Sequence, residues 1–255
     1  MIRYDSTPPR ATITIDDPER HNPLSTAAMA EFAASIDRAA ADAAVRVIVV
    51  TGAGDKAFSA GGDLAGDFVD DPMGRHSDRA ALADAFRALR KAGKPTIARI
   101  NGHALGGGFG VAVGCDIGIA VDSATLGMPE IDVGLWPMMV IAVVQRAMPH
   151  KAALELMMTG RRLSADEAMS LGLVSRVVAS AALDAVVDET VDTLSSKSSA
   201  VLQMGRDAFY GAQDMDFDAA LDYLHNGLTA LALTDDAAEG VAAFLEKREP
   251  NWRGS

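Results

Sequence analysis

The chain has 255 residues, of which 49% are hydrophobic, and this fits one large domain with a sizeable core rather than a disordered chain. Its formal net charge of −12 argues against nucleic acid and anionic membrane surfaces as partners.

The single cysteine, Cys115, cannot form an internal disulfide and is expected to be a small buried residue. The N-terminal segment lacks the apolar core of a signal peptide, and the longest low-polarity run, Val133–Val144, is too short to span a bilayer. We therefore expect a cytoplasmic protein without a membrane segment.

Strands and helices alternate from the start of the chain. Apolar and polar residues alternate over Ala11–Asp16, which predicts a strand. A helix capped by Ser25 or Thr26 follows, with apolar residues at helical spacing. Val45–Gly54 is then a strand that ends in a glycine turn, and the glycine- and aspartate-rich segment Ala65–Ser77 is expected to be a mobile loop.

The alternation continues through the middle of the chain. A helix is predicted over Arg79–Lys91, and further strands lie within Lys94–Ala104 and Asp116–Met128. This order of strands and helices indicates an α/β fold. One last strand is predicted in Leu173–Val178.

The pattern changes toward the C-terminus. After Met138 it is almost wholly helical, and from Ser198 onward only helices are expected. The shift in composition at that point predicts a boundary between residues 1–197 and residues 198–255.

Several common catalytic motifs are absent from the sequence. The glycines of HALGGGFG do not match GxGxxG, and no lysine follows them as in a P-loop. Neither GxSxG nor HExxH occurs. No histidine stands at metal-ligand spacing from another, so no metal is expected. The five histidines are His21, His76, His103, His150 and His225.

Two glycine-rich turns remain, AFSAGGDL (Ala57–Leu64) and HALGGGFG (His103–Gly110), and each follows a predicted strand. The second turn enters a predicted buried helix, whose first residues offer free N–H groups and the positive end of the helix dipole. Because glycine has no Cβ, a ligand atom can approach these groups closely. Two such turns facing each other would hold an oxygen that becomes negative during a reaction. Tight packing of elements that need small residues explains the glycines equally well.

Linked motifs along the chain resemble those of the enoyl-CoA hydratase/isomerase (crotonase) superfamily. They are FSAGGDL, INGHALGGG, MPEIDVGLWP and TGRRLSADEAMSLGLVSRVV. The resemblance covers nearly the whole chain. It implies a crotonase-like (ClpP/crotonase) spiral of repeated ββα units over residues 1–197, holding the CoA and active site. Residues 198–255 would then be a helical oligomerisation region.

The resemblance also implies a substrate and an assembly. Members of the family act on acyl-CoA thioesters, in fatty acid metabolism among other pathways, and are usually homotrimers or dimers of trimers. Coenzyme A is then part of the substrate, and no separate cofactor is expected.

The catalytic positions of the family fall on specific residues of this chain. The resemblance places the oxyanion hole on the backbone N–H groups of Gly62 and Gly107. Glu130 matches one of the two glutamates of the hydratases, whereas Gly110 stands where they carry the other. The family's isomerases use a single glutamate at the Glu130 position, so Gly110 argues against two-glutamate hydration. Asp132 is a weaker candidate for a second acid, because it could face the same side of an extended segment as Glu130.

The sequence around Glu130 indicates an apolar setting. The runs TLGM and VGLW flank its motif, so partial desolvation is expected to raise the pKa of Glu130. A plain solvated carboxylate is the alternative. Trp136, Met138 and Met139 indicate a dry, apolar acyl pocket in place of the glycines that help to hold the catalytic water in hydratases.

The CoA-binding positions are likewise implied by the resemblance. Two segments would contact the pantetheine and adenine, and the last helix would reach the nucleotide of a neighbouring subunit. With the acyl pocket included, the predicted binding residues are Arg20, Leu24, Ala60, Asp63, Leu64, Trp136, Phe244 and Lys247.

The leading hypothesis is an enzyme that forms an enolate from an enoyl-CoA thioester, by double-bond isomerisation or by hydration. Thioester hydrolysis and carbon–carbon cleavage are alternatives within the family. Outside catalysis, the chain would be a silent CoA-binding subunit or an RNA-binding protein, and the negative charge disfavours the latter.

Overall fold

The computed structural model describes residues 1–63 and 76–255 of the chain. The expected loop over Ala65–Ser77 therefore lies almost wholly outside the described residues, and so does the predicted binding residue Leu64. None of the helices in the described parts has both the length and the apolar composition that a membrane crossing requires.

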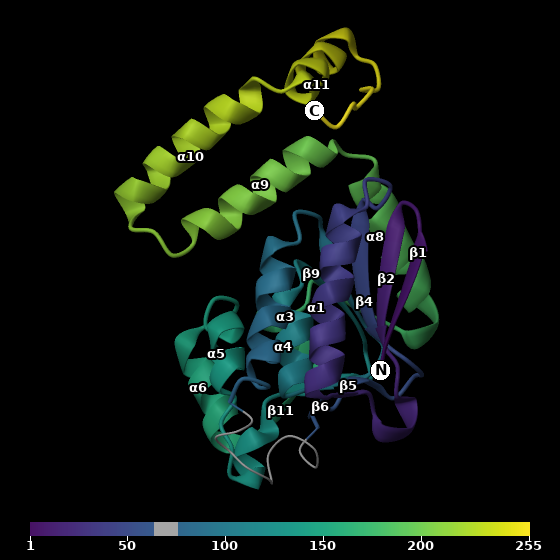
Figure 1. The fold of residues 1–255 in the computed structure, drawn as a ribbon, viewed down its shortest axis with the longest axis vertical. Helices are drawn as coiled ribbons and strands as arrows, with labels where there is room; N and C mark the ends of the chain where they lie inside the picture. The colour runs from purple at the N-terminus through teal and green to yellow at the C-terminus, as the bar shows by residue number, and fades with distance from the viewer. Residues whose placement is uncertain (64–75) are drawn as a thin grey trace.

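A six-stranded sheet forms the centre of the molecule (Figure 1). Its first two strands pair antiparallel, and every later pair is parallel. The predicted strand at Ala11–Asp16 is confirmed as β2, and its hairpin partner β1 is an addition to the prediction. In spatial order the strands are β1 (Ile2–Thr7), β2 (Arg10–Ile15), β4 (Val47–Gly52), β7 (Thr96–Ile100), β9 (Ile117–Val121) and β12 (Arg176–Val178).

Smaller sheets lie at one end of the central sheet. A four-stranded sheet contains β11 (Arg162–Ser164), β10 (Thr125–Gly127), β8 (His103–Leu105) and β5 (Ala57–Ser59). A two-stranded sheet pairs β3 (Pro23–Leu24) with β6 (Gly61–Gly62).

Two predicted strands are each divided between the central and the four-stranded sheet. Lys94–Ala104 contains β7 and β8, and Asp116–Met128 contains β9 and β10. The first division occurs at Gly102, where any Cβ would collide with the backbone carbonyl of Lys56. Three successive stretches of the chain, β4–β5, β7–β8 and β9–β10, each add one strand to the central sheet and then one to the four-stranded sheet, which produces a spiral.

Helices cover both faces of the central sheet. On one side lie α1 (Thr26–Ala41), α3 (Ala80–Lys91) and α4 (Gly107–Gly114), and on the other lies α8 (Leu183–Ser195) (Figure 1). Ser25 caps α1 as expected, because its hydroxyl accepts a hydrogen bond from Ala28 N.

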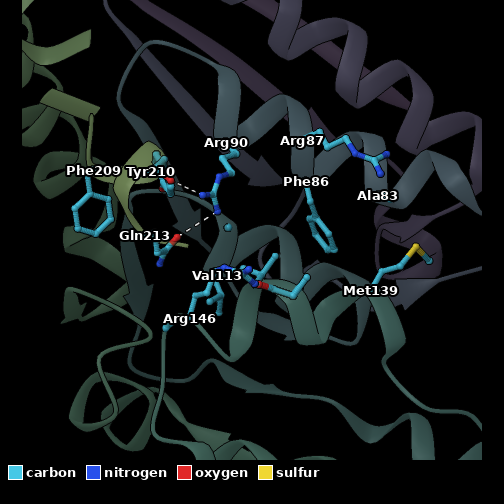
Figure 2. Close-up of a pocket in the computed structure, with 14 residues that line it drawn as sticks. Ala83, Phe86, Arg87, Arg90, Val113, Met139, Arg146, Phe209, Tyr210 and Gln213 are labelled. Atoms are coloured by element: carbon cyan, nitrogen blue, oxygen red, sulfur yellow. Dashed lines mark hydrogen bonds between the residues drawn. The ribbon is translucent and has the colours of Figure 1, made fainter. Parts of the chain in front are cut away.

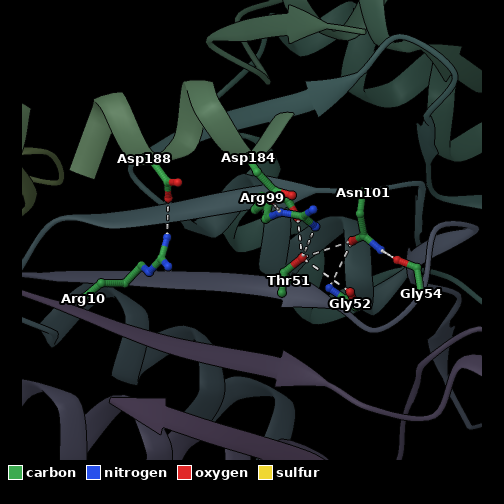
Figure 3. A network of polar contacts seen from close by, with 8 residues as sticks. All are labelled: Arg10, Thr51, Gly52, Gly54, Arg99, Asn101, Asp184 and Asp188. Carbon is green, nitrogen blue, oxygen red and sulfur yellow. Dashed lines mark hydrogen bonds and ion pairs between the residues drawn. The ribbon is translucent and has the colours of Figure 1, made fainter. Parts of the chain in front are cut away.

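Successive side chains of β2 point alternately to the two faces of the sheet. Ile13 and its apolar neighbours are fully buried in the core, whereas Arg10 points the other way and pairs with Asp188 of α8 at 2.6 Å. Arg99 of β7 pairs with Asp184 of the same helix at 2.7 Å, so ion pairs join α8 to the sheet (Figure 3).

The later part of the chain is largely helical, as predicted. The helices after β10 are η2 (Pro129–Val133), α5 (Met138–Val144), α6 (His150–Thr159), α7 (Ala165–Ser170) and η3 (Ser180–Ala182), and η1 (Pro18–Arg20) precedes β3. Ser164 and Glu167 form a capping box at the start of α7.

Only helices follow Ser198, as the sequence predicts. They are α9 (Ser199–Ala212), α10 (Phe217–Ala232) and α11 (Asp235–Glu246), and they extend away from the sheets as a C-terminal arm (Figure 1). Ser198 itself caps α9 through a hydrogen bond from Val201 N. That this region is a separate domain stays a prediction.

Arg206 anchors the C-terminal arm to the body of the protein. Its side chain is only 8% exposed, and its Nε donates to Asp116 Oδ2 at 2.8 Å. The other guanidinium nitrogens donate to the carbonyls of Leu89 and Arg90 at the end of α3. Tyr210 donates to the second oxygen of Asp116 at 2.6 Å, so one carboxylate holds two residues of α9.

We predict that Asp116→Ala lowers the free energy of unfolding by about 3 kcal/mol, because it leaves the Arg206 charge buried without its counter-ion. Urea titration followed by circular dichroism measures this change. Asp84→Ala is the matched control, since it removes an exposed partner of Arg87 and should cost less than about 1 kcal/mol. Equal small losses in both variants would contradict the anchoring role.

Candidate active site

A cavity of about 630 Å³ contains Gly62, Gly107 and Glu130, the three predicted catalytic positions. We call it the Glu130 cavity. Trp136 also lines it, as the predicted acyl pocket requires, together with Met138 and Met139. The remaining apolar wall includes Leu24, Met29, Leu82 and Val140.

The two glycine-rich turns lie against each other in this cavity. A Cβ on Gly61 would be 2.8 Å from Leu105 O and 3.4 Å from Gly107 N, so the turns touch backbone to backbone. A Cβ on Gly107 would be 3.9 Å from Gly62 N. Gly107 is the first residue of α4, and its N–H has no partner within the helix. The turns can therefore present backbone donors from one wall.

Both sequence-based explanations of the glycines apply, but to different residues. Gly61 and Gly106 have positive φ angles, which L-residues with side chains rarely adopt. A Cβ on Gly108 would lie 2.5 Å from the Cβ of Ser59, so this glycine is required for packing. Gly62 and Gly107 face the cavity instead.

Glu130 lies over the N-terminus of α4. A Cβ on Gly106 would be 3.0 Å from its Oε1. Its Oε2 is buried and has no hydrogen-bond partner among the described residues. Burial raises the pKa of Glu130, and a hydrogen bond with its own backbone offsets this in part, so the expected rise is confirmed. A carboxyl group in this state can exchange a proton with a bound molecule.

Gly110 faces an aromatic ring. A Cβ at this position would be 2.7 Å from Cζ of Phe86 and 3.2 Å from Cγ1 of Val140. The space that a second glutamate would need is therefore occupied. Of the described residues that line the Glu130 cavity, Glu130 alone carries a carboxylate.

The expectation that Glu130 and Asp132 share one side of an extended segment is wrong. Pro129–Val133 forms a 3-10 helix, in which residues two apart point in directions about 120° apart. The carboxylate of Asp132 lies instead beside Gly160, where a Cβ would be 2.9 Å from Oδ1. Asp132 is absent from the described lining of the Glu130 cavity.

The predicted CoA-binding segments meet at the edge of the cavity. Pairing of β3 with β6 brings Leu24 beside Gly62. Ala60 N donates to His21 O at 2.9 Å, and Arg20 forms an ion pair with Asp63 at 2.8 Å. Of these residues only Leu24 and Gly62 line the cavity itself, and the contact of the predicted residues with CoA stays a prediction.

Phe244 and Lys247 lie far from the Glu130 cavity of their own chain. They belong to the end of α11 in the C-terminal arm, at the opposite end of the molecule from β6 (Figure 1). Phe244 is 82% exposed. Their predicted role concerns a neighbouring subunit and stays a prediction.

Sequence reasoning missed the contribution of α3. Arg79 and Leu82 line the Glu130 cavity, and Phe86 packs against Gly110. The apolar periodicity of this helix indicates which face is buried, but it does not separate core residues from cavity residues.

Within the described residues, no group of three or more metal-binding side chains lies together.

A family model described as enoyl-CoA hydratase/isomerase matches residues 10–255. The chain is 34% identical over 248 residues to (E)-benzylidenesuccinyl-CoA hydratase from Thauera aromatica, with 96% of each chain covered. It is 33% identical over 222 residues to carnitinyl-CoA dehydratase from Escherichia coli, covering 84% of this chain and 83% of that protein. The crystal structure of enoyl-CoA hydratase from Mycobacterium smegmatis matches with a TM-score of 0.94 and 33% identity, covering 98% of both chains.

We predict that Glu130→Gln raises the Tm at pH 8 but not at pH 3.5. Above the raised pKa of the folded state, the wild type carries a desolvated charge that the amide lacks, and this charge destabilises it. Below the pKa of the unfolded chain the carboxyl is protonated in both states, so the difference disappears. Calorimetric scans at both pH values measure the effect. Glu189→Gln, on the exposed side of α8, should show the same Tm difference at both pH values.

Proposed function

The chain belongs to the enoyl-CoA hydratase/isomerase family, and on that premise we propose that it forms an enolate from an enoyl-CoA thioester with Glu130 as its single acid/base group. Its fold is the crotonase-like spiral with a helical C-terminal region, and its substrates are acyl-CoA thioesters. The observation that carries the proposal is one cavity that holds Glu130 beside Gly62 and Gly107, with one carboxyl oxygen that has no partner among residues 1–63 and 76–255.

The first step of the proposed reaction is removal of a proton from C2 of the thioester. Glu130 accepts this proton, and the electron pair of the C–H bond moves toward the thioester carbonyl. The carbonyl oxygen becomes negative and accepts hydrogen bonds from the N–H groups of Gly62 and Gly107. One donor of this kind contributes about 2.7–4 kcal/mol to transition-state stabilisation, and the dipole of α4 adds to it.

Double-bond isomerisation is the proposed outcome. After the C2 proton of a 3-enoyl thioester is removed, Glu130 returns a proton at C4, and the double bond forms between C2 and C3 as the carbonyl is restored. No water is consumed, and one carboxyl group serves both steps. Two observations favour this reaction: the Phe86 ring stands over Gly110, and the walls near Trp136 are apolar. No separate cofactor is required.

Hydration is the second candidate, and the names of the relatives favour it. Both (E)-benzylidenesuccinyl-CoA hydratase and the Mycobacterium smegmatis enoyl-CoA hydratase are named for water addition. In this reaction the oxygen of water bonds to C3 of a 2-enoyl thioester and a proton is added at C2. Glu130 would have to activate the water and supply the proton in turn.

A panel of 2-enoyl- and 3-enoyl-CoA thioesters in heavy water distinguishes these reactions by mass spectrometry. We predict conversion of 3-enoyl to 2-enoyl thioesters faster than water addition to the latter. Glu130→Gln should lower the isomerisation rate by about 10²–10⁴-fold, because the amide cannot accept the C2 proton. Asp132→Asn is the matched control and should retain the rate, since Asp132 does not line the cavity.

Other results of the panel would change the proposal. Faster hydration than isomerisation would replace the first candidate by the second. Free CoA, or a product shortened by carbon–carbon cleavage, would show a different reaction of the family. Tight binding of thioesters without any turnover would indicate a silent CoA-binding subunit.

We also propose that the C-terminal arm joins copies of the chain into a homotrimer or a dimer of trimers. Large apolar side chains of the arm are open to solvent, among them Phe217 at 76%, Leu228 at 65% and Leu233 at 83%. Apolar surface of this extent is typical of a protein interface.

Sedimentation equilibrium should therefore give a mass of three or six times 26.6 kDa at micromolar concentration. Leu228→Asp should shift the equilibrium toward the monomer by placing a charge in the contact. Met169→Asp, an exposed apolar position on α7 outside the arm, should leave the mass unchanged. A monomeric wild type would contradict the proposal.

A further inference from the structure

A second cavity, of about 410 Å³, adjoins the Glu130 cavity on the side of α9. We call it the α9 cavity. Apolar side chains from four helices line much of it, among them Val113 of α4, Val143 of α5 and Phe209 near the end of α9. Phe86 and Met139 lie toward one end, and Phe209 lies at the other (Figure 2). The proposed reaction makes no use of this cavity.

Met139 separates the two cavities, and Phe86 lies next to this boundary on the side of the α9 cavity. Met139 lines both of them, and Phe86 lines the α9 cavity. Leu82, one helical turn before Phe86, lines the Glu130 cavity instead. Phe86 and Val140 both lie close to Gly110. A Cβ on Gly110 would be 2.7 Å from Cζ of Phe86 and 3.2 Å from Cγ1 of Val140.

Gly110 allows the Phe86 ring to take this place. A glycine inside a helix costs about 0.5–1 kcal/mol relative to alanine. At Gly110 the chain gains room for a rigid ring, since even one methyl group would overlap Cζ of Phe86. Gly110 and Phe86 therefore act as a pair, and the ring stands next to Val140, which lines the Glu130 cavity.

We propose that Phe86 limits the length of the acyl chain that this protein binds. The inference rests on the proposed function, in which the Glu130 cavity holds the acyl part of a CoA thioester. Short chains end at Met139 and Val140, which the ring of Phe86 supports from behind. Without the ring, a longer chain continues past Met139 into the α9 cavity, whose apolar walls bury its methylene groups.

Charged residues set a second limit at the rim of the α9 cavity. Arg90 and Arg146 lie toward the Phe209 end, and each is already paired with a carboxylate (Figure 2). Arg146 and Arg90 share Asp214, at 2.8 and 3.4 Å. An apolar chain end that reached this rim would have to desolvate these ion pairs, so the extension stops there.

Calorimetric titration with butanoyl-, octanoyl- and dodecanoyl-CoA tests the proposal. These saturated thioesters lack the double bond, so their binding is measured without a reaction. For the wild type, the affinity should stop rising beyond the length at which the chain meets Phe86. For Phe86→Ala it should keep rising, by about fourfold for each additional buried methylene group. Phe86→Leu, a smaller change in the core, should give an intermediate length profile.

Phe209→Ala is the matched control. It removes an aromatic ring from the far end of the α9 cavity and leaves the wall intact, so its length profile should equal that of the wild type. Circular dichroism and the Tm confirm that each variant is folded. Equal length profiles for the wild type, Phe86→Ala and Phe86→Leu would overturn this inference alone. Failure of every thioester to bind would overturn the proposed function together with it.

Discussion

The close contact between two glycine turns determines the geometry of the site. Gly61 of β6 approaches Leu105 O and Gly107 N at distances that leave no room for a side chain. Because of this contact, the first N–H groups of α4 lie beside Gly62, and the carboxyl group of Glu130 lies over Gly106. The spiral supplies the two strands, β6 and β8, that carry the turns to this point. A side chain on Gly61 or Gly106 would separate the donors from the acid/base group.

The same geometry gives Glu130 its chemical character. Its carboxyl is held among Met139, Trp136 and other apolar residues, and one of its oxygens has no hydrogen-bond partner in the described parts of the chain. Such a group is unfavourable for the folded state when ionised, and this is the property that a proton acceptor at neutral pH requires. The cost in stability and the proposed activity therefore have one physical origin.

Local sequence patterns such as helix caps predict local structure, but they do not predict contacts between residues that are distant in the sequence. Ser25 caps α1 as expected, because a cap depends on a hydroxyl and on N–H groups three residues away. The division of Lys94–Ala104 into two strands depends on Lys56, which is distant in sequence. The extended geometry expected at Asp132 fails because Pro129–Val133 coils into a 3-10 helix. For the site, the resemblance supplies Gly62, Gly107 and Glu130, but spacing could not reveal that Phe86 meets Gly110, since they belong to different helices.

The contact of Phe86 with Gly110 also determines how substitutions at these two positions depend on each other. A side chain at position 110 displaces the ring, because its first atom would lie 2.7 Å from Cζ of Phe86. A smaller residue at position 86 removes this clash and also reduces the separation from the α9 cavity. Substitutions at the two positions are therefore expected to be epistatic, and a route to a second catalytic acid that passes through position 86 changes the chain-length preference on the way.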